Sequence, residues 1–192
     1  MSSRIFQNVL QPEDISAILE FYQHKPDAKT ESYIPEDFSY QLLHGKIEKI
    51  LGPHEFDTGA YKECIKPYPL HSDSMPECVS GIESVMSFGT KKNLNLAILI
   101  PLVEGDEFCT VVFDCYSTQD LKNKQQPTPN QLKQQDFGHC ANQWPMLNRL
   151  PIVDVYHWRV GDMFIWDRQQ YHVSADFARY GLVKKFLIMF VA

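Results

Sequence analysis

Two side chains able to bind a metal lie two positions apart in the segment Pro69-Leu70-His71-Ser72-Asp73. In an extended chain alternate side chains share a face, so His71 and Asp73 would point the same way. One imidazole and one carboxylate are two of the three ligands of a 2-His-1-carboxylate triad, which holds iron(II) and leaves positions open for oxygen chemistry. A pair this short also occurs by chance on protein surfaces, so a third ligand is required.

His172 supplies the third candidate ligand. It lies in GDMFIWDRQQYHVSADF, where it is expected just beyond a strand and a polar turn. Thirteen positions later, Lys185 opens the last apolar segment, KFLIMFVA. A lone cation at the start of a buried strand is costly unless an anion pairs with it. The far carboxylate of a keto diacid would be such a partner, and lysine can bind it as a point charge.

The elements before this chemistry are predicted to be helical. A first helix is expected from about Pro12, with acidic residues in its first turn and a buried stripe further on. A second helix is expected from about Glu36 to Ile50, ended by Gly52 and Pro53. The buried stripe of the first helix comprises Ile15, Ile18, Leu19 and Tyr22.

The rest of the chain is predicted to be mainly β. The apolar runs Leu94–Leu102 and Phe108–Tyr116 flank a short polar turn, which is typical of an antiparallel hairpin. The first run is apolar on both faces, so we expect it at the centre of a sheet. Further strands are expected at Ile152–Val160, Met163–Trp166 and Phe186–Val191. Helices followed by many short strands favour an α+β fold with a β-sandwich or barrel as its body.

Residues 117–150 fit neither pattern, because they are rich in Gln, Asn and Pro. Composition favours a plain surface loop, although long loops within compact domains are often lids or substrate-binding elements. Apolar residues in its second half would allow that half to dock. They are Phe137, Trp144, Met146 and Leu147. We expect a single catalytic domain over 1–192, with helical support in 1–54 and the β core in 55–192.

Composition excludes several other classes of protein. The chain has 192 residues and a formal net charge of -6, which disfavours a general nucleic-acid binder. No run approaches the roughly 18 apolar residues that a membrane span needs, and the N-terminus lacks a signal-peptide pattern, so we expect a cytoplasmic protein. Five cysteines without a CxxC spacing argue against a zinc ribbon or a disulfide framework.

The order of these features resembles the 2-oxoglutarate/iron(II)-dependent dioxygenase superfamily, in particular its prolyl-hydroxylase-like and phytanoyl-type branches. The resemblance covers roughly residues 55–192. It implies a double-stranded β-helix, a distorted jelly roll, with the N-terminal helices packed on one sheet. It also implies that His71, Asp73 and His172 bind Fe(II). The co-substrates would be 2-oxoglutarate and molecular oxygen, and a small-molecule or peptide substrate would be hydroxylated with release of succinate and carbon dioxide.

The resemblance leaves the co-substrate residues open. Lys185 is the expected anchor for the far carboxylate because Phe186 follows it, but an error of one residue in the register would exchange it for Lys184. Tyr61 and Tyr68 lie upstream of the HxD motif, where related enzymes place residues that line the co-substrate pocket. The preferred explanation of both is that they are aromatic residues packed in the sheet. Two hydroxyl groups, those of Thr110 and Ser174, are further candidates for hydrogen bonds to the co-substrate.

A structural jelly roll such as a coat protein is one alternative, in which the triad and the basic residue would be a coincidence. Two rival functions that involve a ligand or a metal also remain. A jelly roll without catalysis would be a binding module, and its triad would be a set of surface polar residues. A cupin-type metalloenzyme would use a metal without a keto acid, but cupins usually have a second histidine where this chain has Asp73. The same carboxylate disfavours a halogenase, which leaves that position vacant for chloride. The prime substrate and the oligomeric state are not specified by the sequence.

Overall fold

The structure, a computed structural model, describes residues 3–24, 31–33, 38–73, 96–117 and 131–191. The N-terminal part contains β1 (Arg4–Phe6), α1 (Pro12–Gln23), β2 (Glu31–Tyr33) and α2 (Phe38–Leu51). The strands that follow are β3 (Phe56–Cys64), β4 (Leu96–Pro101) and β5 (Cys109–Tyr116). The C-terminal part contains the 3-10 helix η2 (Gln134–Gln143), α3 (Trp144–Leu147), β6 (Ile152–His157), β7 (Met163–Asp167), β8 (Gln170–Ser174), the 3-10 turn η3 (Phe177–Tyr180) and β9 (Lys184–Val191).

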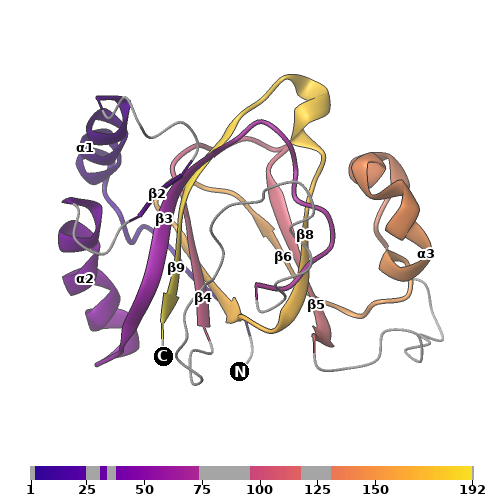
Figure 1. Cartoon of the computed structure of the whole chain (residues 1–192), viewed down its shortest axis with the longest axis horizontal. Coiled ribbons are helices and arrows are strands. Elements are labelled where there is room, and N and C mark those ends of the chain that lie inside the picture. The colour runs from indigo at the N-terminus through magenta and orange to yellow at the C-terminus, as the bar shows by residue number, and fades with distance from the viewer. Residues whose placement is uncertain (1–2, 25–30, 34–37, 74–95, 118–130, 192) are drawn as a thin grey trace.

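Two antiparallel sheets face one another (Figure 1). The six-stranded sheet has the order β1-β7-β4-β9-β3-β2, and the three-stranded sheet has the order β6-β5-β8. An isolated bridge between His71 and His172 adds the HxD segment beside β8. The fold is therefore α+β and mainly β, with the N-terminal helices on one sheet, as the sequence predicts.

The last strand, β9, is buried on both faces. Its inner side chains pack between the sheets, and its outer side chains pack against α1 and α2. The inner set is Phe186, Ile188 and Phe190, and the outer set is Leu187, Met189 and Val191. Burial on both faces explains why the sequence of this strand is a continuous apolar run rather than an alternating one.

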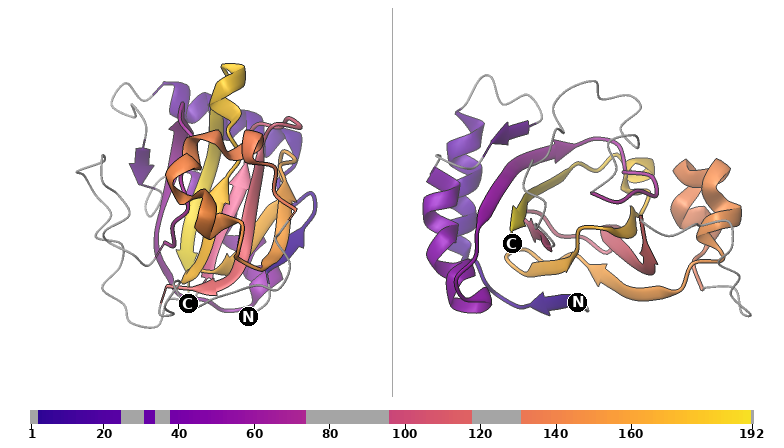
Figure 2. Two further views of the ribbon diagram at one scale, coloured as in Figure 1. Left: turned by 90° about the vertical axis from the view of Figure 1, so that its right-hand side faces the viewer. Right: turned by 60° about the horizontal axis from the view of Figure 1, so that its bottom comes forward.

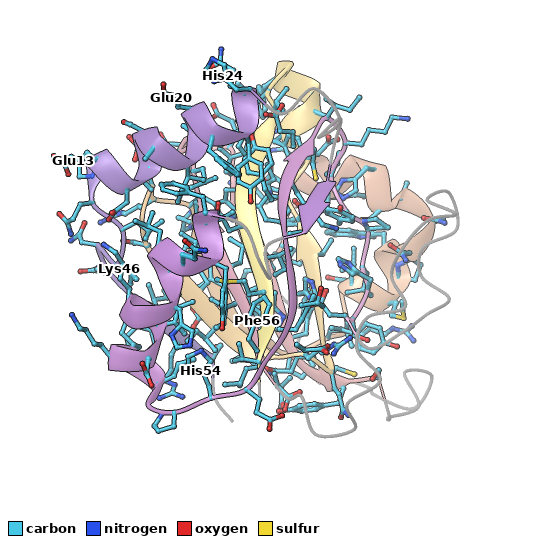
Figure 3. All side chains as sticks on the ribbon, turned by 60° about the vertical axis from the view of Figure 1, so that its left-hand side comes forward. Glu13, Glu20, His24, Lys46, His54 and Phe56 are labelled. Carbon is cyan, nitrogen blue, oxygen red and sulfur yellow. The ribbon has the colours of Figure 1, made fainter. Side chains whose placement is uncertain are left out.

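The two helices form as predicted and cover the outer face of the six-stranded sheet. Helix α1 has a proline in its first turn, and the Asp14 carboxylate accepts the backbone N–H of Gln11. Its polar side is turned to solvent, where Figure 3 shows Glu13, Glu20 and His24. Lys46 of α2 forms an ion pair with Asp14, with an N–O distance of 2.5 Å. None of the described helices combines the length and apolar character that a transmembrane helix requires.

The predicted hairpin of the two apolar runs does not form. Strand β4 lies in the six-stranded sheet between β7 and β9, whereas β5 lies in the three-stranded sheet between β6 and β8. Both edges of β4 are occupied by other strands, so β5 cannot pair with it. The central position expected for the first run is confirmed. The chain between β4 and β5 therefore crosses from one sheet to the other.

Residues 131–150 pack on the outer face of the three-stranded sheet (Figure 2). Phe137 and Leu147 are fully buried there, and Trp144 and Met146 pack beside them. The docking expected for the second half of the polar segment is thus confirmed. Residues 118–130 of that segment lie outside the described part of the chain.

Gly161, in the turn before β7, provides a test of the packing. Its φ is +80°, and an added Cβ would lie 2.5 Å from the backbone oxygen of Leu10. We expect Gly161→Ala to lower the free energy of unfolding by about 2 kcal/mol or more, measured by urea denaturation. Gly45→Ala is the control, because nothing lies within 4 Å of its added Cβ in α2 and alanine favours helix. Equal stability of Gly161→Ala and the wild type would contradict this packing.

Candidate metal centre

His71, Asp73 and His172 converge on the inner side of the three-stranded sheet, and their ligand atoms all lie within 4.8 Å of one another. Oδ1 of Asp73 is 3.9 Å from Nε2 of His71 and 3.8 Å from Nε2 of His172. Reciprocal backbone bonds of 3.1 and 2.8 Å join His71 to His172. The strand pairing therefore places the two imidazoles side by side, and alternation along the chain places the carboxylate on the same face.

Backbone carbonyls orient both imidazoles. Nδ1 of His71 lies 2.7 Å from the oxygen of Pro69, and Nδ1 of His172 lies 3.2 Å from the oxygen of Gln170. A carbonyl oxygen can only accept a hydrogen bond, so each Nδ1 carries the proton. Each Nε2 consequently has a free lone pair directed away from the backbone, which is the arrangement of a histidine that binds a metal through Nε2.

The Asp73 carboxylate carries an orphaned acceptor. Its Oδ2 is buried and has no hydrogen-bond partner among the described residues. The backbone of Asp73 is held at both ends, because its N–H donates to the oxygen of Arg168 and its oxygen accepts from Nε of Arg168. A buried carboxylate with an unpaired oxygen is costly, and a cation held by this carboxylate, whose Oδ1 faces the two imidazoles, would offset that cost. The two imidazoles and the carboxylate therefore fit an iron site.

The neutral state of the His71 ring also favours metal binding. Burial, followed by the charge of the neighbouring His172, lowers the pKa of His71 to about 4. Its ring is therefore neutral near neutral pH. A metal ligand must be deprotonated, so little proton release opposes binding at this residue.

A buried cation enters the same space between the two sheets from the facing sheet. Lys184, at the start of β9, is only 2% exposed, and its Nζ donates to Oγ of Ser174 at 2.5 Å. The ammonium group lies 4.2 Å from the ring centroid of Trp158 and 5.0 Å from that of Phe177. No carboxylate of a described residue forms an ion pair with it. Burial lowers its pKa to about 7, which is the expected response of a cation without an anionic partner.

Two hydroxyl groups accompany this cation. Thr110 and Ser174 are paired across β5 and β8 and are both buried. Oγ of Thr110 accepts the indole N–H of Trp158 at 3.0 Å. Ser174 follows His172 by two positions on one strand, so their side chains share a face about 7 Å apart. The ammonium group of Lys184 thus contacts β8 at Ser174, the next residue after His172 whose side chain faces the space between the sheets.

The structure corrects the expected choice between the two adjacent lysines. Lys185, which the sequence favoured as the anchor, lies on the opposite face of β9, where its Nζ is 3.2 Å from Oε1 of Glu63 and its side chain is 36% exposed. Lys184 lies on the inner face instead. The strand register differs from the expected one by a single residue, which exchanges the faces of the two side chains.

The two candidate tyrosines lie in different parts of the structure. Tyr61 packs on the helical side of the six-stranded sheet, stacked on Tyr22 at 4.0 Å, and its hydroxyl donates to Glu63. It is therefore a packing residue remote from the inner face. The ring of Tyr68 lies 5.4 Å from that of His71, beside the metal-ligand cluster.

Sequence reasoning missed two buried cations near the cluster. Lys62 of β3 is 5% exposed and lies 5.7 Å from the ring centroid of Tyr68. Arg168 is also buried, lies over the ring of Phe190 and reaches to 4.0 Å from Oδ2 of Asp57. The one feature of the sequence that could have indicated a cation near the cluster is the position of Arg168, in the turn four residues before His172.

A cavity of about 820 Å³ lies elsewhere, on the outer face of the three-stranded sheet. Val111 of β5, Val155 of β6 and Phe137 of η2 contribute to its wall. The metal-ligand residues are not among those that line it. Adjacent residues of β5 point to opposite faces, so this cavity and the His–Asp–His cluster are on opposite sides of one sheet.

Known structures share this fold, although no family profile and no curated protein sequence matches the chain. SnoK, a non-haem α-ketoglutarate-dependent carbocyclase from nogalamycin biosynthesis, superposes with a TM-score of 0.60 at 14% identity over 99% of this chain and 79% of its own. The epimerase SnoN, in complex with Fe3+, α-ketoglutarate and nogalamycin RO, gives 0.60 at 12% over 99% and 78%. A Pseudomonas putida prolyl-4-hydroxylase gives 0.53 at 10% over 99% and 91%. The chain thus has the double-stranded β-helix fold of 2-oxoglutarate/Fe(II) oxygenases.

Proposed function

We propose that this chain is a non-haem iron(II) and 2-oxoglutarate-dependent oxygenase that hydroxylates a small-molecule or peptide substrate. His71, Asp73 and His172 would hold the metal, and Lys184 would bind the far carboxylate of 2-oxoglutarate. One observation carries the proposal: a buried lysine without a carboxylate partner among the described residues faces a preoriented His–Asp–His cluster from the opposite sheet and contacts Ser174 on the strand of His172.

The three ligand residues would each act through one atom. The two Nε2 lone pairs and a carboxylate oxygen of Asp73 would occupy one face of the metal, and the remaining positions would stay open for co-substrates and oxygen. Iron(II), when bound with 2-oxoglutarate, would activate molecular oxygen, which is the oxidant: one oxygen atom enters succinate as carbon dioxide is released, and the other becomes the hydroxyl group of the product. The chain itself supplies a fixed geometry and partial neutralisation of the metal charge.

The Lys184 pocket suits a carboxylate. The ammonium group offers charge, and the hydroxyl groups of Ser174 and Thr110 are candidate hydrogen-bond donors. Trp158 and Phe177 form apolar walls around the ammonium group. Exclusion of water by these rings would strengthen the attraction between the lysine and a dianionic keto acid.

The similar structures support a 2-oxoglutarate-dependent enzyme in general rather than one particular reaction. A carbocyclase, an epimerase and a prolyl-4-hydroxylase share the fold. Since enzymes with one fold catalyse different reactions, the choice of hydroxylation is a separate step of the proposal and needs its own test. The test is succinate formation from 2-oxoglutarate by the purified protein in a screen of small molecules and proline-containing peptides. We expect it to require both Fe(II) and oxygen, and succinate release indifferent to both would refute the proposal.

The low pKa of Lys184 predicts proton uptake when 2-oxoglutarate binds. Without the co-substrate, the amine is mostly neutral at pH 8 because burial lowers its pKa to about 7. A bound carboxylate would raise that pKa, so binding should take up about one proton at pH 8 and close to none at pH 6. Calorimetry in buffers of different ionisation enthalpy measures this number. Equal uptake at the two pH values would contradict the assignment of Lys184.

The two rival functions make different predictions at this site. A cupin-type enzyme would bind metal without any need for a carboxylate at Lys184. A binding module would have no need for either the oriented imidazoles or the buried cation. Metal-dependent binding of 2-oxoglutarate therefore separates the proposal from both.

A further inference from the structure

The segment that carries His71 and Asp73 is held from two sides. Along one edge of this segment, His71 pairs with His172 of β8 through two backbone hydrogen bonds. On the other side lies η2, which packs on the outer face of the same sheet. Successive residues of an extended chain direct their backbone groups to opposite sides, so the groups of Leu70 face away from β8.

Gln143, the last residue of η2, satisfies those groups. The N–H of Leu70 donates to Oε1 of Gln143 at 3.1 Å, and Nε2 of Gln143 donates to the oxygen of Leu70 at 3.3 Å. These are the two bonds that a residue in a neighbouring antiparallel strand would make. The primary amide of one side chain therefore takes the place of a strand.

A second residue of η2 supports the same segment. Nε2 of His139 lies 3.2 Å from the oxygen of Tyr68, which also accepts the backbone N–H of Ser174. Cys140, between them, is fully buried against Leu70. Two residues of η2, one on each side of the kink at Cys140, thus contact the backbone of the chain just before His71.

We infer that Gln143 is a positioning residue for His71, and that the η2–α3 segment is a brace for the ligand strand. The segment predicted from composition as a surface loop or lid thereby gains a structural role in its second half. The catalytic consequence rests on the proposed function, because it is the metal that requires His71 and Asp73 to be held in register. A metal ligand displaced by an ångström loses much of its value, so the support of its strand affects affinity.

The brace can be tested without any metal. In Gln143→Met the side chain keeps its length but loses both hydrogen bonds to Leu70. We expect the Leu70 amide, observed by NMR in the metal-free protein, to exchange with solvent about tenfold faster. The Leu70 N–H also approaches the Cys140 thiol, but sulfur is too weak an acceptor to replace the amide oxygen of Gln143. The His71 amide, bonded to His172, should keep its protection.

Two further variants sharpen the test. Gln143→Glu keeps the acceptor for the Leu70 N–H but cannot donate to the Leu70 oxygen, so Leu70 exchange should stay near the wild-type rate. Asn142→Ala is the matched control, because Asn142 is exposed on the same turn and should change nothing. The Mn(II) affinity, measured by calorimetry, should fall about tenfold in Gln143→Met, with a smaller loss in Gln143→Glu.

Unchanged Leu70 exchange in Gln143→Met would overturn the inference. So would an unchanged Mn(II) affinity in a variant whose Leu70 amide has lost protection, because the brace would then not position the ligands. If the wild type binds neither Mn(II) nor 2-oxoglutarate, the proposed function and the positioning role of Gln143 both fail. A Leu70 amide that still responds to Gln143→Met would then show that the contact exists without serving a metal site.

Discussion

Replacing Lys184 with methionine is expected to remove 2-oxoglutarate binding and at the same time to stabilise the protein. The far carboxylate of the keto acid would lose its only proposed cationic partner and face the rings of Trp158 and Phe177 instead. Loss of a buried charge partner weakens binding by on the order of a hundredfold or more. The affinity is measured by calorimetry on the Mn(II)-loaded protein without oxygen.

The stability gain follows from the same burial. The pKa of Lys184 is lowered from its ordinary value of 10.5 to about 7, so the unfolded chain holds its proton more tightly than the folded one. This lysine therefore destabilises the fold, most strongly below pH 7, and the penalty decreases as the pH rises towards 10.5. We expect Lys184→Met to raise the free energy of unfolding by about 2 kcal/mol at pH 6 and by less at pH 9.

Lys185→Met is the matched control. Lys185 is partly exposed on the other face and pairs with Glu63, so its loss should change both properties little. A Lys184→Met variant that binds 2-oxoglutarate normally would contradict the assignment of the anchor. A variant that loses binding only because it unfolds would contradict the stability argument.

Replacing Asp73 with alanine is expected to remove metal binding. Asp73 supplies the only carboxylate of the cluster, and its Oδ1 lies within 4 Å of both ligand nitrogens. Without it, two neutral imidazoles would have to hold a dication alone. Since changes that merely reorient a ligand cost about 10- to 100-fold in affinity, removing one should cost on the order of a hundredfold or more.

Thermal unfolding with and without Mn(II) measures this effect. The metal should raise the midpoint of wild-type unfolding by mass action and should leave that of Asp73→Ala unchanged. Asp114→Ala is the control, because Asp114 lies exposed on β5, and its variant should respond to metal like the wild type. A wild-type response to Mn(II) in Asp73→Ala would show that the metal binds elsewhere.

The three candidate metal ligands were predictable from strand geometry together with the family resemblance. His71 and Asp73 share a face in any extended chain, and the order of the motifs, through its resemblance to the dioxygenase superfamily, added His172. In the structure the turn before His172 carries the chain from β7 in the six-stranded sheet to β8 in the three-stranded sheet, beside the HxD segment. The distances among these three residues confirm their grouping. The two helices were predictable for a similar reason, since their apolar stripes repeat at helical spacing.

The candidate co-substrate residues were not predictable, because β9 is apolar on both faces and the middle of β3 is buried on both faces. Alternation identifies the inner face only where the other face is polar. In β9 both the inner and the outer residues are buried, so the sequence could not show whether Lys184 or Lys185 faces inward. The same ambiguity in β3 concealed that Tyr61 packs against α1 and that Lys62 faces the cluster.

The pairing of β4 and the role of η2 depend on contacts between distant parts of the chain. Two adjacent apolar runs favour a hairpin locally, but β4 is enclosed by β7 and β9, which come later in the sequence. Likewise, nothing in the composition around Gln143 indicates that its amide meets Leu70, 73 positions away. Such contacts are set by tertiary packing rather than by local preference.

The central claim is that one pocket binds both iron(II) and 2-oxoglutarate. Calorimetric titration of 2-oxoglutarate into the wild-type protein without oxygen, in the presence and absence of Fe(II), tests it most directly. Binding that requires Fe(II) is the predicted result, since the keto acid would be held by the metal and by Lys184 together. No binding under either condition would contradict the account and favour a binding module with this fold.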